Sequence, residues 1–360
     1  MIVDRPSSIV DRPSSSIPGR LPLDREFTPL PRWSGGHWMT LYAWGRPRAF
    51  PHLPPAELRL FDVAAGTRVL AHCHWQPRRW EHPTLIALHG LESSSDAHYV
   101  RGLADKAFAA GFNAVRLNQR NCGATEHLSD SLYHSGLTGD PIAVMRELTE
   151  VDGIRAFAIA GYSLGGNLTL KLAGDFGARP PEELRAVCAV SPTMDLAVCV
   201  DALEERQNAI YQWHFVRNLK RRMRRKAAAW PGKWKLDGLP GIRSIREFDE
   251  AYTAPHHGFR DAADYYERAS AMRVIDKISI PTLIITAADD PFVPPGPFKE
   301  PIVGRNRHIT LKLTPHGGHC GFIEESSPGY DGYWAEREIV RFLTSQCRVS
   351  VDVDSRQSDA

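Results

Sequence analysis

The chain lacks any apolar run long enough to cross a membrane. None of its 360 residues lie in a stretch that approaches the roughly 20 consecutive apolar residues of a spanning helix. The first residues also lack the apolar segment of a secretory signal, because Asp4, Arg5 and Pro6 interrupt them early. We therefore expect a cytoplasmic protein.

An excess of one charge and closely spaced cysteines are also missing. The formal net charge is only +2, so the overall field does not favour nucleic acid, and no nucleic-acid partner is expected. The six cysteines are scattered along the chain, at positions 73, 122, 188, 199, 320 and 347. Without an export signal, this spacing predicts free buried thiols rather than disulfides.

The two ends of the chain contain few apolar residues. Residues 2–8, Ile-Val-Asp-Arg-Pro-Ser-Ser, are repeated as residues 9–15, in a segment rich in proline and serine. Such a composition cannot bury enough apolar surface to offset the entropy of ordering. We predict a disordered tail over residues 1–26 and a loose tail over residues 347–360.

Between the ends, short apolar runs alternate with helical patterns. A hairpin is predicted over residues 58–75, strands over 84–88, 113–117, 154–160, 185–190, 281–286 and 309–313, and helices over 96–110, 141–151, 164–173 and 333–345. The strands are apolar on both faces, which predicts an α/β protein whose mainly parallel sheet carries helices on both faces.

One long segment interrupts this alternation. Residues 197–266 show little strand pattern and many aromatic and basic residues, and they stand between two predicted strands. We predict a helical cap inserted at 197–266 into an α/β core formed by residues 27–196 and 267–346.

The sharpest motif is Gly161-Tyr162-Ser163-Leu164-Gly165, which follows a predicted strand and opens a predicted helix. Such a turn holds a serine in a strained conformation above the sheet, where substrate can reach its hydroxyl. A side chain at Gly161 or Gly165 would collide with neighbouring backbone. Ser163 is therefore predicted as a nucleophile, and the helix amino terminus beside it favours developing negative charge.

A serine nucleophile needs a base and an orienting acid, which follow it in this order: serine, acid, histidine. The strand at 281–286 leads to Asp289 and Asp290. We prefer Asp290 as the acid, because it directly precedes Pro291, and Asp289 remains the alternative.

The base is expected after the last strand, where His316 and His319 compete. Gly317 and Gly318 give that loop the freedom to present the ring of His319, so His319 is preferred and His316 is interpreted as structural. An oxyanion hole needs two backbone N–H groups, which we assign to Leu164 and Leu91.

These motifs resemble those of the bacterial YheT-like hydrolases and their eukaryotic relatives, the ABHD1/ABHD3-type α/β-hydrolases. The likeness covers roughly residues 27–344 and includes Gly-His-x-x-Thr at 36–40, His-Gly-Leu at 89–91 with Tyr99, Tyr-His-Ser-Gly at 133–136, Glu-Phe-Asp at 247–249, Asp-Tyr-Tyr at 264–266, Asp-Asp-Pro-Phe at 289–292 and Gly-Gly-His at 317–319. The resemblance implies an α/β-hydrolase fold with a cap, a triad of Ser163, Asp290 and His319, and hydrolysis of carboxylic esters. Asn121 and Cys320 depart from the family pattern.

Two further features of the sequence allow more than one interpretation. His72 and His74 could share a strand face and hold a metal, but no further ligand cluster stands nearby, so a hairpin face is the preferred interpretation. A basic run contains Arg217, Lys220, Arg221, Arg222, Arg224, Arg225 and Lys226, with aromatic residues interleaved. It predicts the solvated face of a cap helix, with peripheral contact to anionic lipid as the alternative.

The sequence thus predicts a serine esterase that acts on short-chain or lipid-like acyl esters and needs no metal or organic cofactor. Two alternatives stay open at this point. The same acyl-serine could pass its acyl group to an alcohol or lysolipid, or the fold could serve a catalytically silent binding protein.

Overall fold

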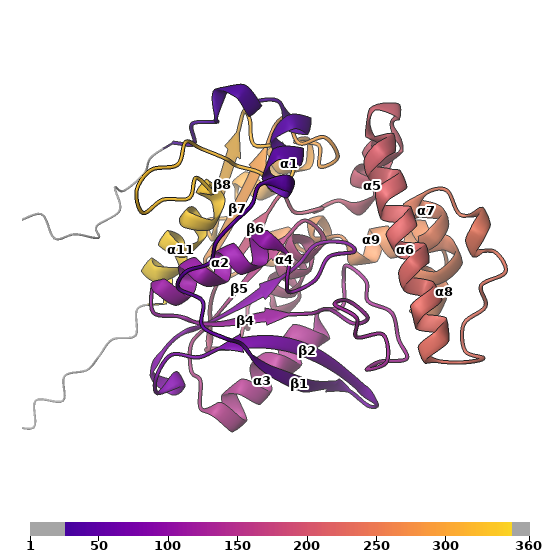
Figure 1. Cartoon of the computed structure of the whole chain (residues 1–360), viewed down its shortest axis with the longest axis horizontal. Coiled ribbons are helices and arrows are strands. Elements are labelled where there is room, and N and C mark those ends of the chain that lie inside the picture. The colour runs from indigo at the N-terminus through magenta and orange to yellow at the C-terminus, as the bar shows by residue number, and fades with distance from the viewer. Residues whose placement is uncertain (1–25, 348–360) are drawn as a thin grey trace, which may run out of the picture.

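The computed structural model describes residues 26–347 (Figure 1). The tails predicted at residues 1–26 and 347–360 therefore lie outside the described residues, apart from Glu26 and Cys347.

The centre of the molecule is an eight-stranded sheet with the strand order β1-β2-β4-β3-β5-β6-β7-β8. Its strands are β1 Glu57–Ala64, β2 Thr67–His74, β3 Thr84–Leu88, β4 Asn113–Leu117, β5 Phe157–Tyr162, β6 Leu184–Val190, β7 Thr282–Ala287 and β8 Ile309–Thr314. The β1–β2 hairpin joins β4 in antiparallel pairing, and all other neighbours are parallel. This confirms the predicted fold class.

Helices cover both faces of this sheet. One face carries α2 (His98–Ala109) and α11 (Trp334–Gln346), and the other carries α3 (Gly139–Asp152) and α4 (Leu164–Phe176). Leu85 and Ala87 pack toward the first pair of helices, whereas Ile86 and Leu88 pack toward the second. Successive side chains of a strand point to opposite faces, so a strand covered on both sides must be apolar throughout.

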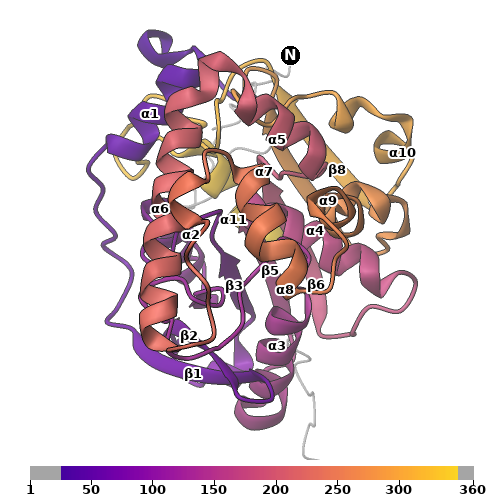
Figure 2. The same ribbon diagram turned by 90° about the vertical axis from the view of Figure 1, so that its right-hand side faces the viewer.

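The segment between β6 and β7 is helical. It contains α5 Leu196–Glu204, α6 Ala209–Ala229, α7 Ile245–Phe248, α8 Ala254–His256 and α9 Ala262–Ala269. Figure 2 shows the long helix α6 and the shorter α7 and α8 in front of the sheet. The boundaries of the cap as a separate unit, residues 197–266, stay a prediction.

Two shorter helices complete the core. Helix α1 (Gly36–Gly45) precedes the sheet in the chain and was not expected from the sequence, while α10 (Pro301–Gly304) lies between β7 and β8. The ring of His37 in α1 stacks on Tyr211 in α6 at a centroid distance of 5.7 Å. An amino-terminal helix and the cap therefore meet above the sheet (Figure 2).

The basic run of α6 is only partly a solvated face, which corrects the expectation from sequence. Arg222 and Lys226 are buried. Arg222 forms an ion pair with Glu92 at 2.9 Å, and Lys226 donates hydrogen bonds to the Asn121 side chain and to the carbonyl of Ser129. Residues four apart lie on the same face of a helix, so the face that packs on the core carries both cations inward.

The other basic side chains of α6 differ in exposure. Arg217, Arg221 and Arg224 are exposed, Arg225 is exposed but pairs with Glu126, and Lys220 is half-buried. Any contact of this helix with an anionic surface therefore depends on three of the seven cations predicted for it.

All cysteines of the chain lie within the described residues. All six cysteines are free, five of them buried and Cys320 half-buried, as predicted. Within residues 26–347, no group of three or more potential ligand side chains could hold a metal ion, His72 and His74 included. No helix of this part is long and apolar enough to span a bilayer.

Candidate active site

Ser163 lies at a sharp turn between β5 and α4 with φ 54° and ψ −117°. This is a conformation that L-residues rarely adopt, and the surroundings enforce it. A Cβ atom at Gly161 would lie 2.0 Å from the Gly165 carbonyl oxygen, and one at Gly165 would lie 2.5 Å from that of His89. Only glycine fits at either position, so the chain must turn with the Ser163 side chain above the sheet.

Asp290 and His319 lie on the loops that follow β7 and β8. His319 Nδ1 lies 2.8 Å from Asp290 Oδ2, in an ion pair whose carboxylate side chain is fully buried. The other carboxylate oxygen accepts hydrogen bonds from the backbone N–H groups of Phe292 and Val293. These bonds hold the carboxylate toward the imidazole and leave Nε2 as the ring nitrogen free to handle a substrate proton.

The neighbouring candidates Asp289 and His316 pair with each other instead. Asp289 Oδ2 lies 3.2 Å from His316 Nδ1, and Asp289 Oδ1 accepts the Gly318 N–H. Both side chains therefore hold the loop that carries His319. This geometry favours Asp290 over Asp289 as the partner of the base.

The electrostatics of His319 are dominated by burial and by Asp290. Burial by itself would lower the pKa of His319. The charge and hydrogen bond of Asp290, together with a smaller contribution of the Cys320 side chain, outweigh burial and raise this pKa above its ordinary value. The Phe292 ring lies against the imidazole at a centroid distance of 4.1 Å. An imidazolium that forms at this place is therefore stabilised by a dry carboxylate.

Two residues that hold the loop of His319, Thr40 and Ser191, were not assigned a role from sequence. Thr40 Oγ1 accepts the backbone N–H of His319 and donates to the Gly36 carbonyl, so α1 is tied to the histidine loop. Ser191 Oγ accepts the N–H of Cys320, the residue after the base. Thr40 stands in the Gly-His-x-x-Thr element, which was the only available signal for its role.

The predicted oxyanion residues lie beside Ser163. A Cβ atom at Gly90 would lie 3.2 Å from the Ser163 Cβ, so the loop after β3 runs directly past the nucleophile. Within the described residues, the backbone N–H groups of Leu91 and Leu164 donate to no other protein group. Tyr99 accepts the Gly90 N–H and holds this loop. The position of both residues beside Ser163 is compatible with the predicted oxyanion hole, which stays a prediction.

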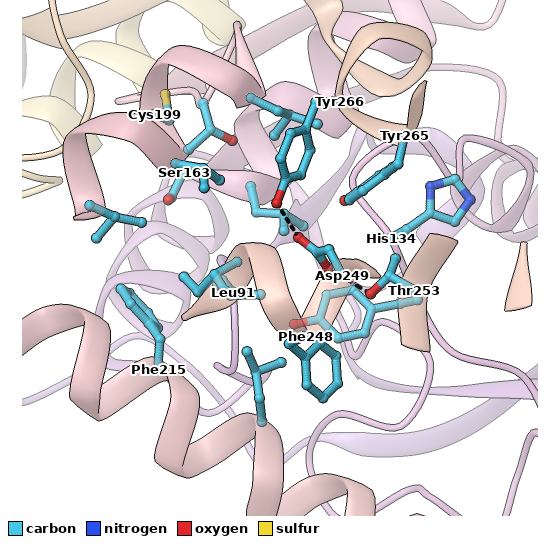
Figure 3. Close-up of a pocket in the computed structure, with 18 of the residues that line it drawn as sticks. Leu91, His134, Ser163, Cys199, Phe215, Phe248, Asp249, Thr253, Tyr265 and Tyr266 are labelled. Carbon is cyan, nitrogen blue, oxygen red and sulfur yellow. Dashed lines mark hydrogen bonds between the residues drawn. The ribbon is translucent and has the colours of Figure 1, made fainter. Parts of the chain in front are cut away.

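Two cavities meet at Ser163, and Figure 3 shows the smaller one. The smaller compartment has a volume of about 70 Å³ and lies between the core and the cap helices. The larger cavity, of about 520 Å³, lies between α1 and α6 and contains His319. Ser163 and His319 share the larger cavity without a direct hydrogen bond between them, as catalytic groups without substrate often do.

The two departures from the family pattern both adopt a positive φ, and one of them, Cys320, lines the larger cavity. Asn121 adopts φ 65°, a conformation that favours glycine, and its side chain accepts the hydrogen bond from Lys226. Cys320 adopts φ 58° and lines the larger cavity next to His319. Asn121 therefore keeps the turn that glycine would allow and adds an anchor for the cap helix.

Comparison with known proteins places this geometry in a family. The model of the alpha/beta hydrolase fold matches residues 83–326. "Putative esterase YheT" of Escherichia coli is 35% identical over 89% of this chain and 93% of its own. "Phospholipase ABHD3" of Mus musculus is 29% identical, and the match covers 67% of this chain and 59% of the mouse protein.

A yeast relative and a solved structure extend the comparison. "Medium-chain fatty acid ethyl ester synthase/esterase 2" of Saccharomyces cerevisiae is 28% identical over 83% of this chain and 68% of its own. The esterase Pf2001 of Pyrococcus furiosus superposes with a TM-score of 0.53 at 14% identity, covering 81% of this chain and 93% of the other, which supports the fold alone. The chain therefore belongs to the alpha/beta hydrolase fold family, in its YheT-like branch.

Proposed function

We propose that this protein hydrolyses carboxylic esters through an acyl-enzyme on Ser163. The observation that carries the proposal is the combination of a strained Ser163 with a buried Asp290–His319 pair at one cavity. The names of the relatives, an esterase and a phospholipase, agree with ester hydrolysis.

In the first half of the reaction, Ser163 Oγ attacks the ester carbonyl and its proton passes to His319 Nε2. The backbone N–H groups of Leu91 and Leu164 hold the resulting oxyanion, and Asp290 stabilises the imidazolium. The bond between the carbonyl carbon and the alcohol oxygen then breaks, and His319 gives its proton to that oxygen. The alcohol leaves, and the acyl group stays on Ser163.

In the second half, water attacks the acyl-enzyme. His319 accepts a proton from this water, the bond from the carbonyl carbon to Ser163 Oγ breaks, and the proton returns to Ser163 as the acid departs. Each half-reaction uses the same base and the same oxyanion donors. No step calls for a group from outside the chain other than ester and water.

A fluorophosphonate probe tests this proposal by intact mass. We expect one adduct on the wild-type protein, none on Ser163→Ala, and an adduct on Ser94→Ala, whose serine lies outside the catalytic group. Ser163→Ala should lose ester turnover while its thermal unfolding stays close to wild type. Folded wild-type protein that takes up no probe would contradict the proposal and favour a silent binding protein.

Acyl transfer is the second candidate, and the yeast relative favours it because its name includes both synthase and esterase. In that reaction an alcohol or lysolipid replaces water in the second half and a new ester forms. Turnover of one ester in the presence of a second alcohol separates the two. A new ester that accumulates in proportion to the added alcohol would establish transfer, and free acid alone would establish hydrolysis.

A peripheral membrane contact rests on a smaller surface than the sequence indicated. Arg217, Arg221 and Arg224 remain exposed on α6. Exposed Trp213 lies on the same helix beside Arg217, whose guanidinium carbon is 5.3 Å from the ring centroid. We propose that this part of α6 contacts anionic lipid.

The cytoplasmic location expected from sequence stays a prediction, for which cell fractionation is the direct measurement.

A further inference from the structure

The two cavities at Ser163 differ in which part of the catalytic group they contain. Ser163 and Leu91 line both of them. His319 lines the larger cavity only, and Leu164 lines the smaller compartment only. The predicted base is thus reached from the larger cavity, and one of the two predicted oxyanion donors is reached from the smaller compartment.

This arrangement determines the direction in which an ester can bind. His319 must deliver a proton to the oxygen of the departing alcohol, so that oxygen has to lie on the side of His319. The acyl chain leaves the same carbonyl carbon in another direction, away from the base. The alcohol part therefore occupies the larger cavity, and the acyl chain points into the smaller compartment.

We propose that the compartment between the core and the cap helices is a short-chain acyl pocket, and that the larger cavity between α1 and α6 binds a bulky apolar alcohol part. This inference rests on the proposed esterase function and names its substrate class. A cavity of about 150 Å³ can hold benzene, so the 70 Å³ of this compartment suit an acyl group of roughly two to four carbons.

The walls of the compartment support this assignment. Its apolar lining comes largely from cap and α5 side chains, among them Leu196, Val200, Leu203, Ile245 and Phe248. These side chains are buried, so the pocket cannot lengthen without moving the cap.

Asp249 also lines the compartment. Its two carboxylate oxygens accept hydrogen bonds from Thr253 and Tyr266, at 2.7 and 2.8 Å. Figure 3 shows this carboxylate apart from Ser163 and bonded to Tyr266. A longer alkyl chain would have to pack against this polar group instead of an apolar wall, which makes elongation of the acyl chain unfavourable.

The larger cavity has the dimensions and rim of a site for a bulky apolar group. Its 520 Å³ fall within the range of pockets that enclose drug-sized ligands. Leu41 and Trp44 from α1 and Ile210 and Trp213 from α6 line it and are also solvent-exposed. It is therefore open toward solvent at an apolar rim, where a long alcohol part can extend.

A pair of leucine truncations tests the assignment. Leu203 lines only the small compartment and Leu41 only the larger cavity. The substrates are naphthyl esters with acyl groups from acetyl to decanoyl, followed by acetyl esters of short and long alcohols. The measured quantity is the profile of kcat/KM against chain length.

We expect the wild-type enzyme to prefer esters with acyl groups of two to four carbons over esters with longer acyl groups. It should also prefer acetyl esters of long alcohols over ethyl acetate. Leu203→Ala should raise the ratio of kcat/KM for hexanoyl esters to kcat/KM for acetyl esters by about tenfold. The reason is that one methylene group in an apolar pocket changes such a ratio by about tenfold or more. Leu41→Ala should leave the acyl profile unchanged and weaken the preference for long alcohols. Val200→Phe, which fills the small compartment, should confine the enzyme to acetyl esters.

The opposite pattern would overturn the assignment. An acyl profile that shifts in Leu41→Ala and not in Leu203→Ala would place the acyl chain in the larger cavity. So would a preference for medium-chain acyl groups on ethanol, the combination in the name of the yeast relative. Fluorophosphonate labelling of Ser163 keeps this failure distinct from failure of the esterase proposal, since labelling does not depend on which cavity holds the acyl chain.

Discussion

At the scale of single residues, the site is built from backbone conformations that only certain residues tolerate. Ser163 can adopt φ 54° in so tight a turn because Gly161 and Gly165 carry no side chain, for which the neighbouring backbone leaves no space. Asp290 is held by two backbone N–H groups, so its second oxygen faces His319. These contacts hold the side chains of Ser163, Asp290 and His319 in place before a substrate binds. A site that is preorganised in this way lowers the activation barrier, because its groups need not rearrange during the reaction.

The Asp290–His319 pair leads to a prediction about pH. The base must be neutral to accept the Ser163 proton, so kcat/KM should rise with pH through the pKa of His319, which Asp290 places above the ordinary value of 6.5. Asp290→Asn removes the negative charge beside His319, so the rise of kcat/KM should move to lower pH. The same variant should lower kcat by about 10⁴-fold. This rising part of the pH profile is called the limb below. The measurement is the pH profile of kcat/KM for both proteins.

Asp289→Asn is the matched control for this experiment. Asp289 contacts His316 and Gly318 rather than His319, so this variant should lose less activity and keep the limb near its wild-type position. If the limb moved in Asp289→Asn and stayed in Asp290→Asn, the assignment of the acid would be wrong.

At the scale of elements, α6 is attached to the core by buried cations. The side chains of Arg222 and Glu92 are each only 5% exposed and form an ion pair. Burial raises the pKa of Glu92, and the charge of Arg222 acts in the opposite direction. The ionised form of the Glu92 carboxylate is therefore stabilised by Arg222. Glu92 stands in the loop after β3, next to Leu91, so the cap helix and the oxyanion loop are coupled.

This coupling predicts the stability of two variants. Arg222→Met leaves Glu92 buried and unpaired, which should cost about 3–5 kcal/mol of the free energy of unfolding. The double variant Arg222→Met with Glu92→Gln removes the unpaired charge and should recover most of that loss. Urea unfolding of the three proteins measures both quantities, and equal stability of the single and double variants would show that the pair is not coupled.

At the scale of the whole molecule, the opening of the larger cavity lies on an apolar surface. Trp44 and Trp213 are 70% and 60% exposed and come from α1 and α6. The ring of His214 on α6 lies 6.4 Å from that of Trp44, so the two elements share one rim. Exposed tryptophans beside arginines are typical of surfaces that lie in the headgroup region of a membrane.

We therefore expect this rim to bind anionic vesicles. Replacement of Trp44 and Trp213 by alanine should weaken cosedimentation with phosphatidylserine vesicles, and higher salt should weaken that of the wild type. Trp80→Ala is the control, because Trp80 is 56% exposed but lies in the segment before β3, away from the cavity. Equal losses in the control and the double variant would contradict a specific rim. Thermal unfolding and fluorophosphonate labelling of Ser163 should stay close to wild type in all of them, because neither depends on the alcohol part that the larger cavity is proposed to bind.

The sequence by itself determined the fold and most of the candidate site. The strands β3 and β4 begin and end where the apolar runs predicted them, and β5 with the Gly-x-Ser-x-Gly turn located Ser163. Such features depend on residues close together in the chain, where periodicity and glycine requirements act directly. The roles of Ser163, Asp290, His319, Leu91 and Leu164 remain proposals that the experiments above address.

Only the tertiary structure decided which neighbours meet. Asp289 and Asp290 are adjacent in sequence, yet they face different histidines because the chain turns after β7. Arg222 and Lys226 are buried although their run is strongly basic, since a helix face is oriented by what it packs against. The two cavities at Ser163 likewise form from segments far apart in the chain, α1 and the cap helices among them. Packing over such distances leaves no local pattern from which a sequence could reveal it.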